Sequence, residues 1–204
     1  MSERLPTREQ ALQFLRESGC SKNVIRHCEA VTELAVEIAK ACAEKGLNVN
    51  LGLVEIGALL HDIGRAKTHS VHHAIAGAQI AKSLGLPEPI ISIIKRHVGG
   101  GITAKEAKKL GWPKDIYVPQ TLEEKIVTHA DNLVGEFSVR TVWDASVDFE
   151  RRGLDKAAQR LRAMHEELSR ICKRDIDELL APLRNNLRFS GSCSDHIYQQ
   201  GRNL

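Results

Sequence analysis

A histidine and an aspartate stand side by side in an apolar segment, as His61-Asp62 within the run Ala58 to Gly64. Removing an unpaired carboxylate from water is costly, so a buried charged side chain is normally paired or bound to a metal ion. Four more residues of metal-binding type lie on or beside apolar helical faces elsewhere in the chain: His27, His73, His97 and Asp131. The six residues together predict a metal site.

Helical spacing directs these side chains toward the interior, because residues three, four or seven apart share one face of a helix. His27 lies three residues after Val24 and four before Val31, and Asp131 lies four after Val127. His61-Asp62, His73 and His97 have the same relation to apolar neighbours in their own segments. Lysine and arginine do not occur on these faces in the number needed to neutralise two aspartates.

Four imidazoles and two carboxylates, without a thiolate, suit divalent iron, manganese, cobalt, nickel or zinc. Six protein ligands exceed the number that one catalytic ion uses, because such an ion keeps a position open for water or substrate. We therefore expect two ions that share the set. Asp62 is the expected bridging carboxylate because it is central in the set along the sequence.

Three other histidines leave alternatives open. His72 or His69 could replace His73 as the ligand, although helical phase and the following Gly77 favour His73. His129 lies two residues before Asp131, so it should point elsewhere, either on the helix surface or beside the ligands.

Helical patterns fill almost all of residues 7–183, and strand alternation is nearly absent. Capping boxes open helices at Thr7, Thr103 and Thr121. The fold class is therefore predicted to be all-α. Helices are expected over residues 7–19, 21–46, 50–64, 73–84, 87–97, 103–111 and from 121 through Asp131, with one or two more within 154–183.

Length and composition restrict the class of protein. The chain has 204 residues, 42% apolar and 27% charged, with a net charge of +3, which gives no strong signal for nucleic-acid binding. No apolar run approaches the ~20 residues that span a bilayer. The chain start lacks the apolar region of a secretory signal, so we expect a cytoplasmic protein. The five cysteines are scattered, which favours reduced thiols, with Cys28 and Cys42 as core residues.

We expect a single domain over residues 1–184, with the ligand-bearing core at about 20–140 and further helices at 141–184. The polar stretch 185–204 is expected to be a flexible tail. Whether residues 140–183 complete the core or form a lid stays open at this point. Their apolar content would also permit an oligomer.

The order His27, His61-Asp62, Asp131 resembles the H…HD…D pattern of the HD-domain superfamily of metal-dependent phosphohydrolases. The sequence His61-Asp62-Ile63-Gly64 matches the HDIG form of the motif, and the segments around His73 and His97 resemble the extra histidine motifs of two-metal members. The resemblance covers roughly residues 20–140 and implies an all-helical HD bundle. It implies that His27, His61, Asp62 and Asp131 bind the first metal. It also implies that His73, His97 and a bridging Asp62 bind the second. The Gly-Tyr-Pro element of one subgroup of cyclic-dinucleotide phosphodiesterases is absent.

The expected reaction is hydrolysis of a phosphate ester or anhydride by metal-bound hydroxide, with His61 and Asp62 as catalytic residues. The expected substrate is nucleotide-like or another small phosphorylated molecule. Additional residues could bind its phosphates: Arg65, Lys67 and Arg96 by charge, and Gly99 and Gly100 through backbone amides. The glycines could equally form only a flexible loop.

Two other functions use the same pattern. A di-iron oxygenase of HD type would employ the same six ligands to activate dioxygen. A non-catalytic binding module would use the metals only to hold its helices together. The ligand types alone do not separate these functions from a hydrolase.

Overall fold

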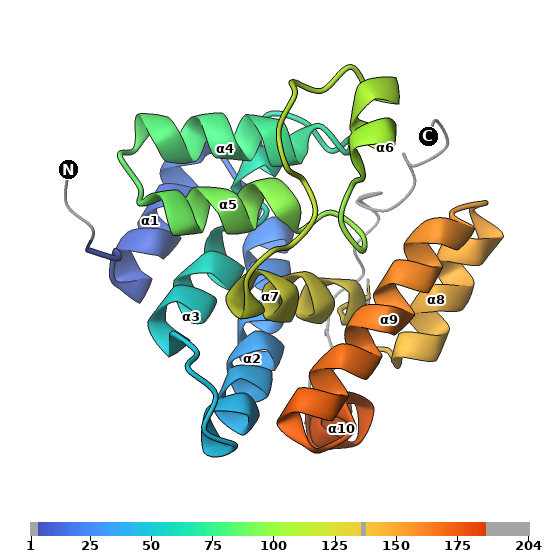
Figure 1. Ribbon diagram of the computed structural model, residues 1–204. Coiled ribbons are helices and arrows are strands. Elements are labelled where there is room, and N and C mark those ends of the chain that lie inside the picture. Colours follow the sequence, from blue (N-terminus) through green and yellow to red (C-terminus); the bar gives the residue numbers. More distant parts are fainter. Residues whose placement is uncertain (1–3, 136–137, 187–204) are drawn as a thin grey trace.

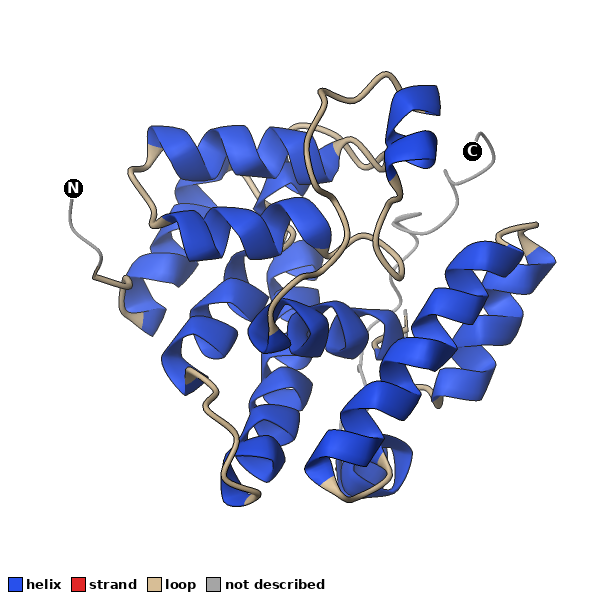
Figure 2. Cartoon of the chain, in the orientation of Figure 1, coloured by secondary structure: helices blue, strands red, loops and turns tan. Residues whose placement is uncertain are grey.

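Helices begin where the sequence supplies capping side chains. The side chains of Thr7, Thr103 and Thr121 each accept a hydrogen bond from the backbone amide three residues later, and the side chain of the Gln or Glu there accepts one from the backbone amide of the threonine. The computed structural model describes residues 4–135 and 138–186, which are helical apart from loops and two isolated β-bridges (Figure 2). The elements are α1 Arg8–Ser18, α2 Lys22–Glu44, α3 Leu51–Leu60, the 3-10 turn η1 Ile63–Ala66, α4 His73–Ser83, α5 Glu88–Arg96, α6 Ala104–Lys109, α7 Leu122–Leu133, α8 Val142–Arg151, α9 Asp155–Cys172 and α10 Ile176–Asn186.

The long helix α2 and the helix α7 form the centre of the bundle, and α3 packs against both (Figure 1). The α4–α5 pair covers one side of this centre, where α4 contacts η1 and α5 contacts α3 and α7. On the other side α9 and α10 pack on α2, and α8 pairs with α9. Leu34 and Ile38 of α2 share one apolar cluster with Leu161, Leu168 and Leu180. The C-terminal helices therefore complete the core.

Two glycines allow η1 to approach the start of α4 closely. A Cβ on Gly64 would lie 1.9 Å from the carbonyl oxygen of His73 and 2.5 Å from the amide nitrogen of Gly77. A Cβ on Gly77 would in turn lie 3.1 Å from the amide nitrogen of Gly64. Because only glycine permits this approach of two backbones, the pair fixes Asp62, which precedes η1, beside the first turn of α4.

The C-terminal part contains the expected helices and differs from the sequence expectation at one boundary. Residues 154–183 form two helices, and α10 continues to residue 186, two residues into the expected tail. Residues 187–204 lie outside the described residues. The helix α8 falls within residues 141–184, where further helices were expected without stated bounds, and Thr141 and Asp144 form a capping box at its start. Val142, Ala145, Ser146 and Phe149 share one face of this helix, where Ala145 and Ser146 are buried, whereas Trp143 is exposed.

The expectation of reduced thiols is wrong for one pair of cysteines. Cys42, near the end of α2, and Cys172, the last residue of α9, form a disulfide with their Cα atoms 4.7 Å apart. The two residues are 130 positions apart in sequence, so no local spacing could indicate the pairing. Cys20 and Cys28 are buried free thiols. None of the described helices combines the length and apolar character needed to cross a membrane.

Candidate metal centre

All six predicted ligands meet at one place, each at or near the end of an element. His27 comes from the second turn of α2, and His61-Asp62 joins α3 to η1. His73 is the first residue of α4, His97 directly follows α5, and Asp131 lies in the last turn of α7. The side chains of His61, Asp62 and His97 are at most 1% exposed, and that of Asp131 is 19% exposed.

Asp62 lies between two groups of histidines. Its Oδ1 is 3.1 Å from Nε2 of His73 and 3.5 Å from Nε2 of His97. Its Oδ2 is 3.8 Å from Nε2 of His27 and 3.7 Å from Nε2 of His61. Because its two oxygens face different histidine pairs, Asp62 has the position that a bridging carboxylate requires.

Asp131 completes the group around His27. Its Oδ1 is 2.9 Å from Nε2 of His27 and 3.4 Å from Nε2 of His61. The resulting arrangement has two halves that share Asp62. One half contains His27, His61 and Asp131, and the other contains His73 and His97.

Backbone carbonyls fix the tautomers of three ligands. Nδ1 of His61 donates to the carbonyl oxygen of Ala58 at 2.6 Å, and Nδ1 of His97 donates to that of Ile94 at 2.7 Å. Nδ1 of His73 donates to the carbonyl oxygen of Ser70 at 2.7 Å. A carbonyl oxygen can only accept, so the proton of each neutral ring is on Nδ1 and Nε2 carries a lone pair. These hydrogen bonds orient a histidine for metal binding.

The donor set fits a divalent cation. Nε2 of His73 and Nε2 of His97 face each other at 2.9 Å, and the buried atoms His61 Nε2 and Asp62 Oδ1 have no hydrogen-bond partner. Buried polar atoms left without partners are costly, and a bound cation would satisfy all four of these atoms. Imidazole and carboxylate ligands without thiolate are those that borderline divalent metals prefer.

The charges of the site lead to the same conclusion. Burial alone would raise the pKa of Asp62, but Arg65 and His61 hold that pKa well below its ordinary value. The pKa of Asp131 is likewise well below its ordinary value, because His61 and His27 outweigh burial. Burial, together with the charge of Arg65, lowers the pKa of His73 to about 4. The centre therefore holds two carboxylates and a neutral imidazole at neutral pH.

The raised pKa of His61 shows that this centre attracts positive charge. Burial alone would lower the pKa of His61, but the carboxylates of Asp62 and Asp131 raise it well above its ordinary value. A proton or a metal ion at Nε2 of His61 is stabilised by the same two carboxylates.

Arg65 and Arg96, expected to bind substrate phosphates, both have protein partners. The Arg65 side chain is paired with Asp62, so one arginine does partly neutralise the two aspartates. Nη1 of Arg96 donates to Oε1 of the buried Glu124 at 2.7 Å, and Nε donates to the carbonyl oxygen of Ile116. Arg96 thus ties α5 to α7. Lys67 is exposed at the end of η1.

The glycine loop after His97 is packed tightly. The carbonyl oxygen of Gly99 accepts a hydrogen bond from the side-chain amide of Asn132 at 2.9 Å. A Cβ on Gly100 would lie 2.7 Å from Cβ of Arg160 and 3.1 Å from the amide nitrogen of Leu161. Gly100 therefore allows the loop to contact α9, and Gly99 connects the loop to the residue after Asp131.

The structure also separates the ligands from the other histidines. His72 turns to the carbonyl oxygen of Leu110 and to the ring of Trp112, and His69 is exposed, which leaves His73 at Asp62. His129 points away from the six ligands, as expected.

His129 is fully buried rather than on the surface. Its Nε2 is 3.2 Å from Nδ1 of His165, whose Nε2 is 3.4 Å from a carboxylate oxygen of Asp175. Burial, reinforced by His165, lowers the pKa of His129 to about 3. Local spacing in the sequence does not indicate this buried pair, because it joins α7 to α9 across the core.

Comparison with known proteins supports the architecture. The family model for the HD domain matches residues 24–135. The tRNA (cytidine(56)-2'-O)-methyltransferase of Picrophilus torridus is 43% identical over 179 residues, which are 88% of this chain and 51% of that protein. An uncharacterized protein of Methanocaldococcus jannaschii is 44% identical over 168 residues, 81% of this chain and 98% of that protein. The chain thus spans about half the length of the methyltransferase that it matches.

Among solved structures, the HD domain of the L. monocytogenes phosphodiesterase PgpH in complex with cyclic-di-AMP has a TM-score of 0.53. The match covers 91% of this chain and 100% of that chain at 22% sequence identity. This likeness concerns the fold.

Proposed function

The chain belongs to the HD-domain family, and from this premise we propose that it is a metal-dependent phosphohydrolase that cleaves phosphodiester bonds in a nucleotide-containing substrate. One observation carries the proposal. The two oxygens of Asp62 face separate histidine pairs, in a centre where backbone carbonyls hold three imidazoles through Nδ1 with Nε2 directed at the carboxylates.

His27, His61, Asp62 and Asp131 would hold one divalent ion, and His73 and His97 would hold a second together with Asp62. Bound ions of this kind supply Lewis acidity, which makes water nucleophilic near neutral pH and neutralises charge on a phosphoryl group. The chain contributes orientation, because the carbonyl oxygens of Ala58, Ser70 and Ile94 fix the three rings before any ligand arrives.

Two further features of the chain suit a phosphate substrate. Asp131 and His27 are the most exposed of the six ligands, with 19% and 10% of their side chains accessible, so substrate would approach from their side. The guanidinium group of Arg65 beside Asp62 adds positive charge at the edge of the centre, and this group pairs well with phosphate oxygens.

The relatives support the choice of a nucleotide substrate. The structural neighbour is a phosphodiesterase seen with cyclic-di-AMP, and a sequence relative is named for a reaction on tRNA. Both names concern molecules whose nucleotides are joined by phosphodiester bonds. We therefore favour a phosphodiester over a phosphate monoester or an anhydride.

The test is hydrolysis by the full chain loaded in turn with Mn²⁺, Fe²⁺, Co²⁺, Ni²⁺ or Zn²⁺. Substrates would be bis(p-nitrophenyl) phosphate, p-nitrophenyl phosphate, a cyclic dinucleotide and a short oligoribonucleotide. We expect turnover of the diesters that Asp62→Ala abolishes. The matched control is His72→Ala, which removes the histidine adjacent to His73 that faces Leu110 and Trp112. A metal-loaded protein that is inert on the whole panel would contradict the proposal.

A further inference from the structure

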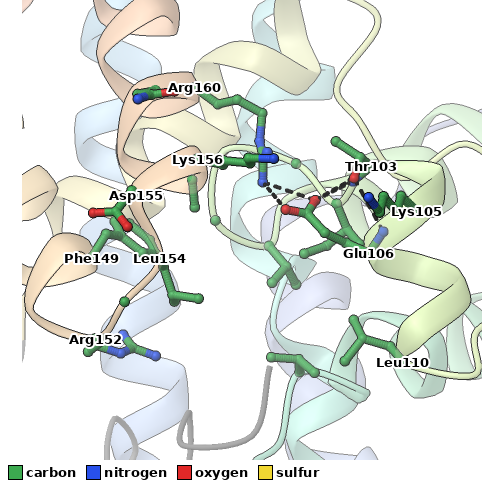
Figure 3. A pocket seen from close by; sticks show the side chains of 18 of the residues that line it. Thr103, Lys105, Glu106, Leu110, Phe149, Arg152, Leu154, Asp155, Lys156 and Arg160 are labelled. Carbon is green, nitrogen blue, oxygen red and sulfur yellow. Dashed lines mark hydrogen bonds and ion pairs between the residues drawn. The ribbon is translucent and has the colours of Figure 1, made fainter.

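A cavity of about 680 Å³ lies between α6, the loop after α5 and the α8–α9 connection (Figure 3). Its wall includes Val98 and Gly99, which directly follow His97, and Val71, which lies two residues before His73. None of the six metal-ligand candidates lines it. Its volume lies within the range of about 300–1,000 Å³ that is usual for ligand pockets.

The cavity gathers positive charge from separate elements. Arg160 crosses from α9 to α6, where its Nη2 donates to both carboxylate oxygens of Glu106 at 3.1 and 3.2 Å (Figure 3). The lysines of the lining are exposed and form no ion pair among the described residues. The lining has two acidic side chains, Glu106 and Asp155. Its basic side chains are more numerous: Lys105, Lys109, Arg152, Lys156 and Arg160. A concave surface with such a balance attracts anions.

The cavity also has an apolar side. Phe149 and Leu154 lie on the α8–α9 side, and Leu110 lies opposite them after α6 (Figure 3). Phe149 is only partly buried, and the guanidinium carbon of Arg152 is 5.8 Å from the centre of its ring. Inorganic phosphate has no apolar part that could contact this surface. Aromatic side chains next to unpaired cations are typical of sites where bases stack and the phosphate backbone follows a basic groove.

We infer that this cavity binds a segment of single-stranded nucleic acid, with a base against Phe149 and Leu154 and phosphates near Lys105 and Lys156. The wall formed by Val98 and Gly99 is continuous with His97, so the bound nucleotide would neighbour the one at the metal centre. The ligand would accordingly contain two or more nucleotides. That the neighbouring phosphodiester is the bond cleaved rests on the proposed function. The binding of nucleic acid in the cavity does not rest on it.

Binding can be measured without turnover. We would titrate the full chain, in buffer with EDTA, into a fluorescein-labelled RNA of ten nucleotides and into the DNA of the same sequence, and follow anisotropy. We expect binding that weakens at least tenfold in Lys105→Glu/Lys156→Glu and also weakens in Phe149→Ala. The charge-matched control is Lys40→Glu/Lys82→Glu, at exposed lysines of α2 and α4 outside the cavity. Thermal melting of each variant would verify that it is folded.

The outcomes of the titration test the site, the role of its apolar side and the type of strand separately. Equal weakening by the Lys40→Glu/Lys82→Glu control, or no binding of either strand, would overturn the inference. Inorganic polyphosphate that competes as well as the oligonucleotide, with no effect of Phe149→Ala, would overturn the assignment of a base to the apolar side. RNA and DNA share bases and phosphates, so a preference between the two strands would identify which one is the ligand.

Binding and hydrolysis measured on the same wild-type protein test the nucleic-acid site and the proposed function separately. Wild-type chain that binds RNA but hydrolyses no diester would refute the phosphohydrolase and retain the binding site. Chain that hydrolyses bis(p-nitrophenyl) phosphate but binds no strand would refute the binding site alone.

Discussion

Replacing Gly64 by alanine should separate the two halves of the metal centre. The added Cβ would lie 1.9 Å from the carbonyl oxygen of His73, and real Cβ contacts essentially never fall below 3.0 Å. The obstructing atom belongs to the backbone of α4, so it cannot rotate away, and the start of α4 must move. Metal–ligand distances are kept within about 0.2 Å, so a movement of this size removes His73 from an ion shared with Asp62.

The expected magnitudes follow from that displacement. Overpacking of this kind costs about 1–3 kcal/mol, which corresponds to a fall in melting temperature of roughly 2–12 °C for a chain of this size. Elemental analysis of protein purified without chelator should give about two metal equivalents per wild-type chain and about one per Gly64→Ala chain, because His27, His61 and Asp131 do not depend on α4.

The control for this experiment is Gly57→Ala in α3. Its Cβ would also be crowded, at 2.4 Å, but the obstructing atom is Cδ1 of Ile93, the end of a flexible side chain. Gly57→Ala should therefore keep both metal equivalents. If Gly64→Ala kept two equivalents and the wild-type melting temperature, the inference that backbone contact holds His73 at Asp62 would be refuted.

Other predictions concern stability, acid and metal removal. Arg96→Met should destabilise the fold by about 3 kcal/mol in denaturant titrations, because it removes the cationic partner of the buried Glu124 carboxylate; an increase in KM with unchanged stability would instead support Arg96 as a substrate ligand. Addition of EDTA should lower the melting temperature by roughly 5–10 °C if the metal is present at about 100 times its Kd, and an unchanged melting temperature would speak against a metal bound to the folded state. His129 has a pKa of about 3 in the folded chain, below its unfolded value, so the unfolded chain binds more protons and stability must fall as the pH drops from about 6.5 toward 3. In metal-free protein below pH 6, His129→Gln should reduce the pH dependence of the unfolding free energy by about 1.4 kcal/mol per pH unit. His72→Gln, the exposed control, should leave that pH dependence unchanged.

The sequence was sufficient for the parts of the fold that depend on local pattern. The capping boxes at Thr7, Thr103 and Thr121 begin α1, α6 and α7 as predicted. The six ligand candidates converge because each lies on the apolar face of a helix or directly beyond its end, and apolar faces are buried together. The all-α class follows from the same periodicity.

Features that depend on contacts between distant elements could not be predicted. The Cys42–Cys172 disulfide and the His129–His165 contact each join helices that are far apart in sequence. The basic cavity could not be predicted for a related reason, because its lysines come from α6 and α9 and meet only after folding, whereas the net charge of +3 averages over the whole chain. The pairing of Arg65 with Asp62 could not be predicted either, because the turn that brings the two side chains together is not visible in the pattern.

The hydrogen bonds from the His61 and His97 rings to Ala58 and Ile94 have a second consequence. Both carbonyls belong to the last turn of a helix, where backbone acceptors lack partners within the helix. Each ring therefore closes the end of its helix with one nitrogen while it offers the other to a metal. The partial negative charge at the ends of α3 and α5 favours a cation at the same point. An alanine at either position removes a helix cap together with a ligand, so loss of metal and fraying of the helix end would occur together.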